Sequence, residues 1–339
     1  MKLPDLPYPI VVMGASRGGL QILKAVLSAL PADFPAPVLV AMHVGAHESR
    51  LPELLAAVCG LKVKHATDAQ SIEPGTVLVA PPDRHMLVDG DKIRLMLGAK
   101  ENYSRPAIDP LFRSAAISHR ERVIGVVLTG DLDDGTVGLQ AIKACGGVAL
   151  VQDPDEAEAP SMPLSAITYV EFDACLPSAQ IAERLMSLVQ EQRSVGGSGP
   201  TQTMVIENDI SLGVSQDSIS SLDQVAPRSV MTCPECRGVL WEMDSAPLRY
   251  RCHTGHTYGP SVMQSLQDRS IEEGLWAAVR AFHEKEVLMR RQREAAVAEE
   301  RHEQAQEYEM VADQARRNAH SLRQLLQAAV VPDTASKGN

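Results

Sequence analysis

Residues 9–20 read PIVVMGASRGGL, and this stretch decides the fold of the first half of the chain. Four apolar residues, Ile10 to Met13, lead into a turn with three glycines and one serine, and then into the apolar spacing of a helix. A strand that runs directly into a helix is the opening unit of an α/β fold. The turn allows three interpretations: a phosphate-binding loop, a nucleophile presented on a sharp bend, or a tight turn without a chemical role.

Apolar runs of strand length alternate with amphipathic stretches of helix length up to about residue 190. The runs are continuous, as in strands buried on both faces of a parallel sheet. Asp89-Gly90 lies between two short runs, which predicts a β-hairpin over 85–97. We therefore predict that residues 1–192 form a doubly wound, mostly parallel sheet with three α/β/α layers. The predicted strands are 9–14, 36–43, 76–82, 121–130, 146–153 and 171–177.

The composition changes after residue 192. Residues 193–230 are polar, rich in serine and weakly periodic, which favours a flexible, extended linker. A cysteine cluster over 231–260 predicts a small zinc-ribbon-like β module. Residues 261–330 are almost free of Gly and Pro and have apolar residues at helical spacing, which predicts a helical tail, either a hairpin or one long helix. We expect 331–339 to be disordered.

Charge and hydropathy exclude some classes of protein. The net charge of −11 argues against a nucleic-acid binder, which needs a basic face. No run approaches the 18 or more apolar residues of a membrane span, and the first residues lack a signal-peptide pattern. We therefore expect a cytoplasmic protein without membrane insertion, in a compartment where cysteines stay reduced.

Three residues with complementary chemistry follow strands that are predicted to end at the same edge of the sheet. Ser16 follows the first strand, His43 the second, and Asp134 lies just past the strand over 121–130. A serine nucleophile needs a base to take its proton, and the base needs an acid to orient it. Gly14-x-Ser16-x-Gly18 also fits the bend of a nucleophile elbow.

Other interpretations of the same residues exist. A glycine-rich turn of this kind commonly binds phosphate, but the dinucleotide fingerprint needs glycine where Ser16 stands, and the Gly-Lys-Ser/Thr of a phosphate loop is absent. A single histidine at a strand end is commonly structural. Asp131, Asp133 and Asp134 also fit helix caps or solvated turn residues.

Several ordered motifs resemble the catalytic domain of the chemotaxis protein-glutamate methylesterases, the CheB family. They are GASRGG, the end of VLVAMH, APPDRHM, SRPAIDPLFRSAA, VIGVVLTGDLDDGTVGLQAIKACGG, VQDP and SMPLSAI, and they span residues 9 to about 185. The resemblance implies hydrolysis of glutamyl methyl esters on chemoreceptors, often with glutamine deamidation, and no cofactor for catalysis.

The resemblance also implies roles for single residues. Ser16 would be the nucleophile, His43 the base and Asp134 the acid, since Asp134 aligns with the aspartate before the last glycine of the family's GMGxDG motif. The backbone amides of Arg17 and Asp131 would form the oxyanion hole. This sequence departs from the family at both positions, where threonine and methionine are usual, and we expect Arg17 and Asp131 to pair. The family's N-terminal phosphoacceptor domain has no room before residue 9, so we expect control from the C-terminal half or another chain.

A second constellation lies in the C-terminal half. Cys233 and Cys236 are separated by two residues, and Cys252 and His256 follow after a short predicted hairpin. Three thiols and one imidazole are a ligand set that tetrahedral Zn²⁺ selects, with His253 as the alternative fourth ligand. Because protein would fill all four positions, we predict a structural zinc site. The other interpretation is three buried thiols in a small hairpin.

We predict a protein-glutamate methylesterase that acts on the methylated cytoplasmic domains of chemoreceptors. The alternative is a catalytically weakened scaffold of a chemosensory system, which the changes at Arg17 and Asp131 favour. A third option is an esterase or amidase outside chemotaxis. The mixed Glu/Arg surface of the tail suits self-association or docking to a signalling protein. Trp276 is expected to pack the first tail helix on the ribbon or on its partner helix.

Overall fold

The computed structural model describes residues 8–191, 197–243 and 246–329. The chain divides into two compact units, Met1–Val262 and Met263–Asn339. The predicted disordered segment 331–339 and residues 193–196 of the predicted linker lie outside the described residues.

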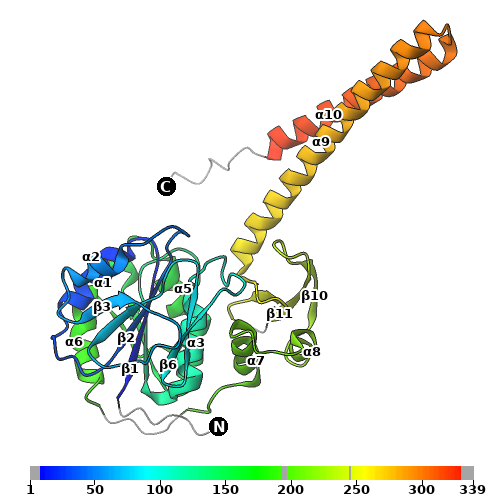
Figure 1. Ribbon diagram of the computed structural model, residues 1–339. Helices are drawn as coiled ribbons and strands as arrows, with labels where there is room; N and C mark the ends of the chain where they lie inside the picture. The colour runs from blue at the N-terminus through cyan, green and yellow to red at the C-terminus, as the bar shows by residue number, and fades with distance from the viewer. Residues whose placement is uncertain (1–7, 192–196, 244–245, 330–339) are drawn as a thin grey trace. The chain divides into compact units, whose positions relative to one another are not determined.

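A seven-stranded parallel sheet forms the centre of the first unit, in the strand order β3-β4-β2-β1-β7-β8-β9 (Figure 1). This sheet confirms the predicted α/β class. Its strands are β1 (Ile10–Ala15), β2 (Val38–Met42), β3 (Lys62–His65), β4 (Thr76–Val79), β7 (Val123–Val127), β8 (Val148–Gln152) and β9 (Ala174–Leu176). The sequence pattern did not predict β3, because this edge strand reads Lys-Val-Lys-His and lacks an apolar run.

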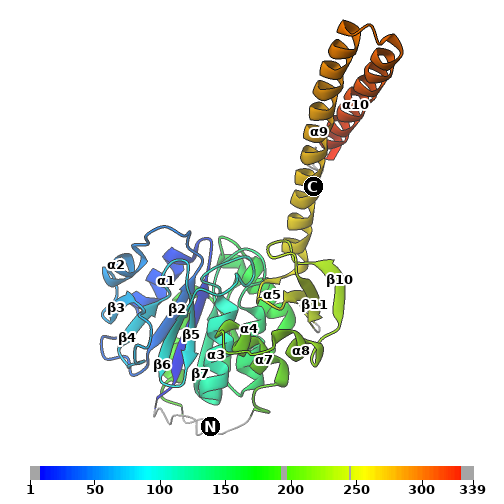
Figure 2. The ribbon, with the colours of Figure 1, turned by 45° about the vertical axis from the view of Figure 1, so that its right-hand side comes forward.

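Helices cover both faces of the sheet (Figure 2). Alternate residues of β1 enter two separate cores: Val11 and Met13 pack with one set of helices, and Ile10 and Val12 pack with the other. The first set is α1 (Gly19–Ser28), α2 (Leu51–Ala56) and α6 (Ser178–Leu188). The second set is α3 (Ile108–His119), α4 (Thr136–Ala144) and α5 (Ser161–Tyr169). The continuous apolar runs of the strands are explained by this burial on two faces.

The hairpin predicted around Asp89-Gly90 is confirmed. It consists of β5 (His85–Asp89) and β6 (Lys92–Met96), which pair in antiparallel register, and Gly90 has a φ of 62° in the turn. Two short 3-10 helices, η1 (Arg120–Arg122) and η2 (Pro154–Glu156), complete this part of the unit.

The expected extended linker is wrong for the described residues 201–223. This segment forms α7 (Gln202–Ser211) and α8 (Ser218–Asp223), capped by the side chains of Thr201 and Asp217. Both views show these helices beside β10 and β11 (Figures 1 and 2). The serine-rich sequence hides the pattern because α7 buries polar side chains such as Glu207 and Ser211 as well as apolar ones.

A four-stranded antiparallel sheet follows, which we call the Cys/His module (residues 228–258). Its strands are β10 (Arg228–Thr232), β11 (Val239–Met243), β12 (Arg249–Cys252) and β13 (Thr257–Tyr258). β11 and β12 form the hairpin that the sequence predicts between the two ligand pairs. Trp241 is buried against Leu222 of α8, so the module and the preceding helices share a small core.

The second unit contains a helical hairpin, one of the two forms expected for the tail. It is made by α9 (Pro260–Ala298), which begins in the first unit, and α10 (His302–Ala329). Arg290 of α9 pairs with Glu309 and Asp313 of α10, at 3.7 and 3.9 Å. Trp276 is not a fully buried packing residue: its side chain is 50% exposed, and its ring N–H donates to Glu272, one turn earlier.

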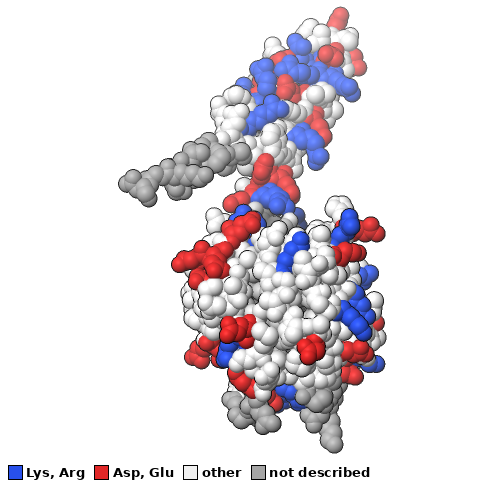
Figure 3. Space-filling view, turned by 90° about the vertical axis from the view of Figure 1, so that its left-hand side faces the viewer, with Lys and Arg blue, Asp and Glu red and all other residues white. Residues whose placement is uncertain are grey.

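Among the described residues, no helix combines the length and apolarity that crossing a membrane requires. Figure 3 shows one face of the molecule. At the centre of the first unit this face carries few charged side chains, and charges of both signs are interspersed around its edge. A basic stripe of the kind that follows a phosphate backbone is not seen on this face.

Candidate active site

Ser16, His43 and Asp134 meet at the carboxyl edge of the sheet. Their strands β2, β1 and β7 are neighbours in the sheet, so the three chain segments leave the same edge side by side. Backbone hydrogen bonds extend this order past the strand ends: the Ser16 N–H donates to the Thr129 carbonyl at 2.9 Å, and the His43 N–H donates to the Ala15 carbonyl at 3.1 Å. Ligands and chemistry collect at this edge in open α/β sheets.

The three side chains form one continuous hydrogen-bond chain. Ser16 Oγ lies 3.0 Å from His43 Nδ1, and His43 Nε2 lies 2.6 Å from Asp134 Oδ2. An ionised carboxylate can only accept, so Nε2 carries the ring proton and Nδ1 has a free lone pair toward Ser16. The imidazole is therefore oriented to take the serine proton, which is the geometry of nucleophilic catalysis.

Asp134 is buried but well supplied with donors. Its Oδ2 accepts from the Ile108 N–H at 2.7 Å, and its Oδ1 accepts from the Asp109 N–H at 3.1 Å, both at the start of α3. Asn102 Nδ2 donates to Oδ1 at 2.7 Å. Burial raises the pKa of Asp134, but the hydrogen bond and charge of His43, with the Ile108 and Asn102 donors, bring that pKa below its ordinary value. The carboxylate therefore stays ionised beside His43.

A second buried carboxylate, Asp109, stabilises the loop around Asp134. Its Oδ1 accepts from the backbone N–H groups of Gly135 and Gly138, at 3.0 and 2.7 Å, where α4 begins. Its Oδ2 accepts from Asn102 Nδ2 at 2.7 Å. Burial and the charge of Asp134 raise the pKa of Asp109 above its ordinary value. Asn102 thus lies between two carboxylates and donates to both.

The glycines of the turn allow close packing around Ser16. Gly18 has a φ of 76°, which disfavours other residues, and it caps α1. A Cβ on Gly14 would come within 2.4 Å of Ile108, and one on Gly130 within 2.7 Å of the Ser16 Cβ. The chain at Gly130 therefore passes directly beside Ser16, and the next peptide amide is that of Asp131.

Arg17 and Asp131 form the ion pair expected from the sequence. Arg17 Nη2 lies 2.7 Å from Asp131 Oδ1, and the two side chains are 59% and 47% exposed. Solvent screens a pair this exposed, so it contributes little to stability. Its effect is local, because it neutralises a carboxylate next to the amides expected to receive an oxyanion.

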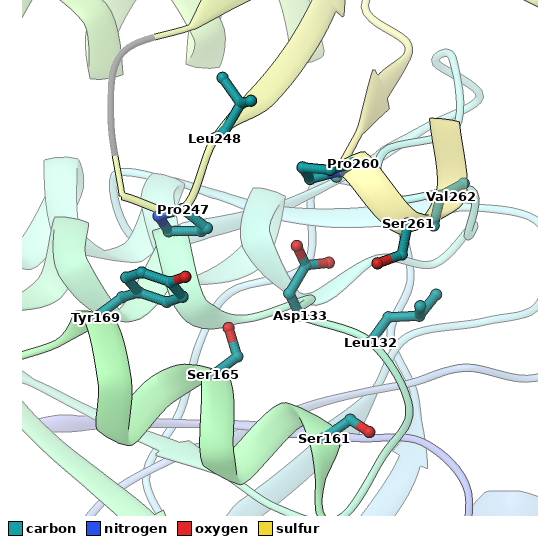
Figure 4. Close-up of a pocket in the computed structure, with 11 residues that line it drawn as sticks. Leu132, Asp133, Ser161, Ser165, Tyr169, Pro247, Leu248, Pro260, Ser261 and Val262 are labelled. Carbon is teal, nitrogen blue, oxygen red and sulfur yellow. The ribbon is translucent and has the colours of Figure 1, made fainter. Parts of the chain in front are cut away.

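A cavity of about 410 Å³ borders the loop that carries Asp134 (Figure 4). It is lined by Leu132 and Asp133 of the loop, by Ser165 and Tyr169 of α5, and by Leu248 and Pro260. Ser16 and His43 are not among its lining residues. The Asp133 carboxylate is directed toward the segment that begins at Pro260, and burial and the charge of Asp134 raise its pKa.

The cysteine cluster lies at the end of β12 and in the neighbouring loops of the Cys/His module. One ligand atom from each of Cys233, Cys236, Cys252 and His256 lies within 4.8 Å of all the others. Cys236 and Cys252 have their sulfur atoms 3.7 Å apart, and His256 Nδ1 lies 3.4 Å from Cys252 Sγ. Zn–S bonds of about 2.3 Å in a tetrahedron put two sulfurs about 3.8 Å apart, so the spacing fits this geometry.

The surroundings of the cluster distinguish His256 from His253. His256 presents Nδ1 to the thiols, and its Nε2 lies 2.7 Å from Glu235 Oε2. A carboxylate on the distal nitrogen of a ligating histidine is a common arrangement in metal sites. Tyr258 and Thr254 place hydroxyl groups 3.2 Å from Cys233 Sγ and 2.9 Å from Cys252 Sγ. The donor set and its neighbours therefore fit a metal ion.

Sequence reasoning missed Asn102 and Asp109. Both belong to stretches that precede or begin α3, and no strand end marks them. Asp109 is part of the motif SRPAIDPLFRSAA, which supports the family resemblance without marking Asp109 itself. The sequence does carry one signal for Asp109. It is an acidic residue in the first turn of a predicted helix near the carboxyl edge of the sheet, where it can cap a neighbouring helix.

Comparisons with known proteins cover the α/β part of the chain. A family model described as CheB methylesterase matches residues 11–185. A Leptospira interrogans relative is 40% identical over 191 residues, which is 55% of this chain and 99% of that protein. A Burkholderia thailandensis relative, named protein-glutamate methylesterase/protein-glutamine glutaminase 3, is 36% identical over 53% of this chain and 51% of its own length. The crystal structure of the Thermotoga maritima CheB methylesterase catalytic domain matches with a TM-score of 0.51 and 34% identity, covering 54% of this chain and all of that domain.

Proposed function

Because this chain belongs to the CheB methylesterase family, we propose that it is a protein-glutamate methylesterase that hydrolyses glutamyl methyl esters on chemoreceptors. The same chemistry on glutamine would release ammonia, so the proposal includes glutamine deamidation. The observation that carries it is the continuous chain of hydrogen bonds from Ser16 Oγ through His43 to Asp134.

The proposed reaction has two halves. Ser16 Oγ attacks the ester carbonyl carbon while its proton moves to His43 Nδ1, and the amides of Arg17 and Asp131 receive the developing oxyanion. His43 then gives the proton to the methoxy oxygen, the C–O bond breaks, and methanol leaves. Water attacks the glutamyl-Ser16 ester with His43 again as base, which releases glutamate and free Ser16. Asp134 stabilises the imidazolium in both halves.

Release of methanol from methylated receptor cytoplasmic domains tests this function. The wild-type chain is expected to release methanol, and Ser16→Ala is expected to lower the rate by about 10³-fold or more. Ser28→Ala is a matched control, since the hydroxyl of this exposed serine on α1 donates to the Ala25 carbonyl within the same helix. Release that does not depend on Ser16 would contradict the mechanism.

The alternative, a catalytically weakened scaffold, is favoured by one observation: a carboxylate at Asp131 lies next to the expected oxyanion position. The same experiment separates the two functions. If no methylated receptor releases methanol in a Ser16-dependent way, the scaffold replaces the enzyme as the better proposal.

We also propose that the Cys/His module holds a structural zinc ion. Cys233, Cys236, Cys252 and His256 would bind it, and Glu235 would orient the imidazole. A module this small has little apolar core, and metal binding would supply part of its folding free energy. All four positions are protein ligands, so the ion would have no place for substrate.

A further inference from the structure

The Asn102 turn lies between the catalytic acid and the Cys/His module. On one side, Asn102 Nδ2 donates to Asp134 Oδ1 and to Asp109 Oδ2, both at 2.7 Å. On the other side, the backbone N–H of Asn102 donates to Thr257 Oγ1 at 2.9 Å. One residue thus contacts both the acid of the proposed triad and β13 of the module.

The turn needs support from its surroundings. Asn102 and Tyr103 have φ values of 50° and 60°, in the left-handed region that residues other than glycine adopt at an energetic cost. Two contacts from Thr257 supply part of this support. Its N–H donates to the Lys100 carbonyl at 3.3 Å, and its hydroxyl faces Asn102 Oδ1 at 3.5 Å. Thr257 is buried and directly follows His256, a candidate metal ligand.

A buried ion cluster holds the preceding residue, Glu101. Arg113 of α3 binds its carboxylate at 3.0 and 3.1 Å, and Arg251 of β12 binds it at 3.1 and 3.4 Å. Arg251 has no exposed surface, so its charge is fully buried against Glu101 and α7. The residue before Asn102 is therefore fixed from the module as well as from the catalytic part.

The chain directly after the module contacts the other flank of Asp134. A Cβ on Gly259 would lie 2.5 Å from Asp133 Oδ2, so the chain just after β13 packs directly on the residue before the acid. Asp134 is thus supported from two sides. Thr257 accepts from Asn102, which donates to Asp134, and Gly259 packs on Asp133, the residue before the acid.

We propose that the Cys/His module controls the esterase by positioning the catalytic acid: Thr257 and Arg251 hold the Glu101–Asn102 turn, and Asn102 fixes Asp134 for His43. Asn102 and Thr257 are positioning residues, since neither touches the reacting atoms. This inference rests on the proposed function of Ser16. It goes beyond that function because it makes the reactivity of Ser16 depend on the folded state of a module that lies outside the 11–185 match to the family model.

Labelling of Ser16 by diisopropyl fluorophosphate tests the coupling without a receptor substrate. In this reaction the Ser16 oxygen bonds to phosphorus, the P–F bond breaks, fluoride leaves, and His43 takes the serine proton. Thr257→Val removes the accepting hydroxyl and is expected to slow labelling about fivefold, the loss that one hydrogen bond typically causes. Thr257→Ser keeps the hydroxyl and is expected to restore the rate.

Two further variants make the test independent of folding defects. Asn102→Ala is expected to lower kcat for methanol release about tenfold with KM unchanged, because the acid loses its donor while substrate contacts remain. Val230→Ala, on a fully exposed residue of β10 in the same module, is the matched control and is expected to label at the wild-type rate.

The outcomes separate this inference from the proposed function. Wild-type labelling rates in both Thr257→Val and Asn102→Ala would overturn the positioning role, even if methanol release depends on Ser16. A wild-type chain whose Ser16 neither reacts with the fluorophosphate nor releases methanol would instead overturn the proposed function. Equal slowing in Thr257→Val and Thr257→Ser would also contradict the hydroxyl contact.

Discussion

Asp134 shows what a buried acid requires beyond its partner histidine. Two backbone N–H groups at the start of α3 and the amide of Asn102 donate to its carboxylate, in addition to His43. A buried carboxylate without such donors would take up a proton and could no longer stabilise an imidazolium. The residues that keep the acid charged thus belong to the site as much as the acid does.

The sequence identifies the residues that strand ends bring together, but not those that support them. Ser16, His43 and Asp134 were selected because each follows a predicted strand, and the structure brings their side chains into contact. Asn102 donates to the carboxylates of Asp109 and Asp134, and Asp109 accepts from backbone N–H groups where α4 begins, so both contacts depend on how α3 and α4 pack.

The Arg17–Asp131 pair leads to a prediction at the residue scale. Arg17→Thr leaves the Asp131 carboxylate unpaired beside the oxyanion amides and is expected to lower kcat for methanol release about threefold, a small effect because the pair is exposed. The double change Arg17→Thr/Asp131→Met removes both charges and is expected to return kcat to near the wild-type value. Asp131→Met alone serves as the matched control for loss of the carboxylate. A double variant as slow as Arg17→Thr, together with Asp131→Met at the wild-type rate, would show that the two side chains are not coupled.

At the scale of elements, the apolar runs of the sequence predict the sheet, whereas the sequence pattern does not predict the polar helices α7 and α8. Five of the six strand runs are visible because their strands are buried on two faces and must be apolar along their length, whereas β9 is a half-buried edge strand with a weaker run. α7 is buried too, but through charged and hydroxyl side chains that read as linker sequence. Glu207 accepts from Arg249 at 2.5 and 2.8 Å and from Arg251 at 3.4 Å, so this helix connects to the module through ion pairs.

Glu207→Gln tests whether α7 stabilises the unit. Burial by itself raises the pKa of Glu207, but the charges of Arg249 and Arg113 outweigh burial and lower this pKa to about 2. The variant leaves buried guanidinium groups without this partner, and we expect its free energy of unfolding at pH 7 to fall by about 3 kcal/mol in urea titrations. Because the folded pKa is depressed, this contribution is present above about pH 4.5 and is lost as the pH falls through about 2.

Asp209→Asn is the control for Glu207→Gln, since Asp209 lies on the same helix and outside the ion cluster. We expect it to change the free energy of unfolding by no more than about 0.5 kcal/mol. A loss that is equal for the two variants, or a difference between wild type and Glu207→Gln that does not shrink below pH 4.5, would exclude the buried ion pairs as its cause.

At the scale of the whole molecule, the sequence predicts which parts follow one another along the chain, but not which of these parts pack together. The cysteine spacing and the helical tail are evident from residue types, whereas the union of the α/β part, α7 and the Cys/His module depends on single buried arginines that composition does not distinguish. In the tail, the turn between α9 and α10 has no Gly or Pro, and Glu300 adopts a φ of 57° there. That is why the sequence left a hairpin and one long helix as alternatives.

The proposed zinc ion leads to the prediction at this scale. The purified chain is expected to contain about one zinc per molecule, measured by mass spectrometry of the metal. Cys233→Ser and His256→Ala are expected to lower this content strongly, because each removes one of four converging ligands. His253→Ala and Cys145→Ser are matched controls, since neither residue belongs to the cluster, and both are expected to keep the full content. Metal content that survives Cys233→Ser would refute the site, and loss in His253→Ala but not in His256→Ala would transfer the fourth ligand to His253.

Chelation of the ion is expected to expose residues 228–258 to protease, since metal binding and folding of a small module are coupled.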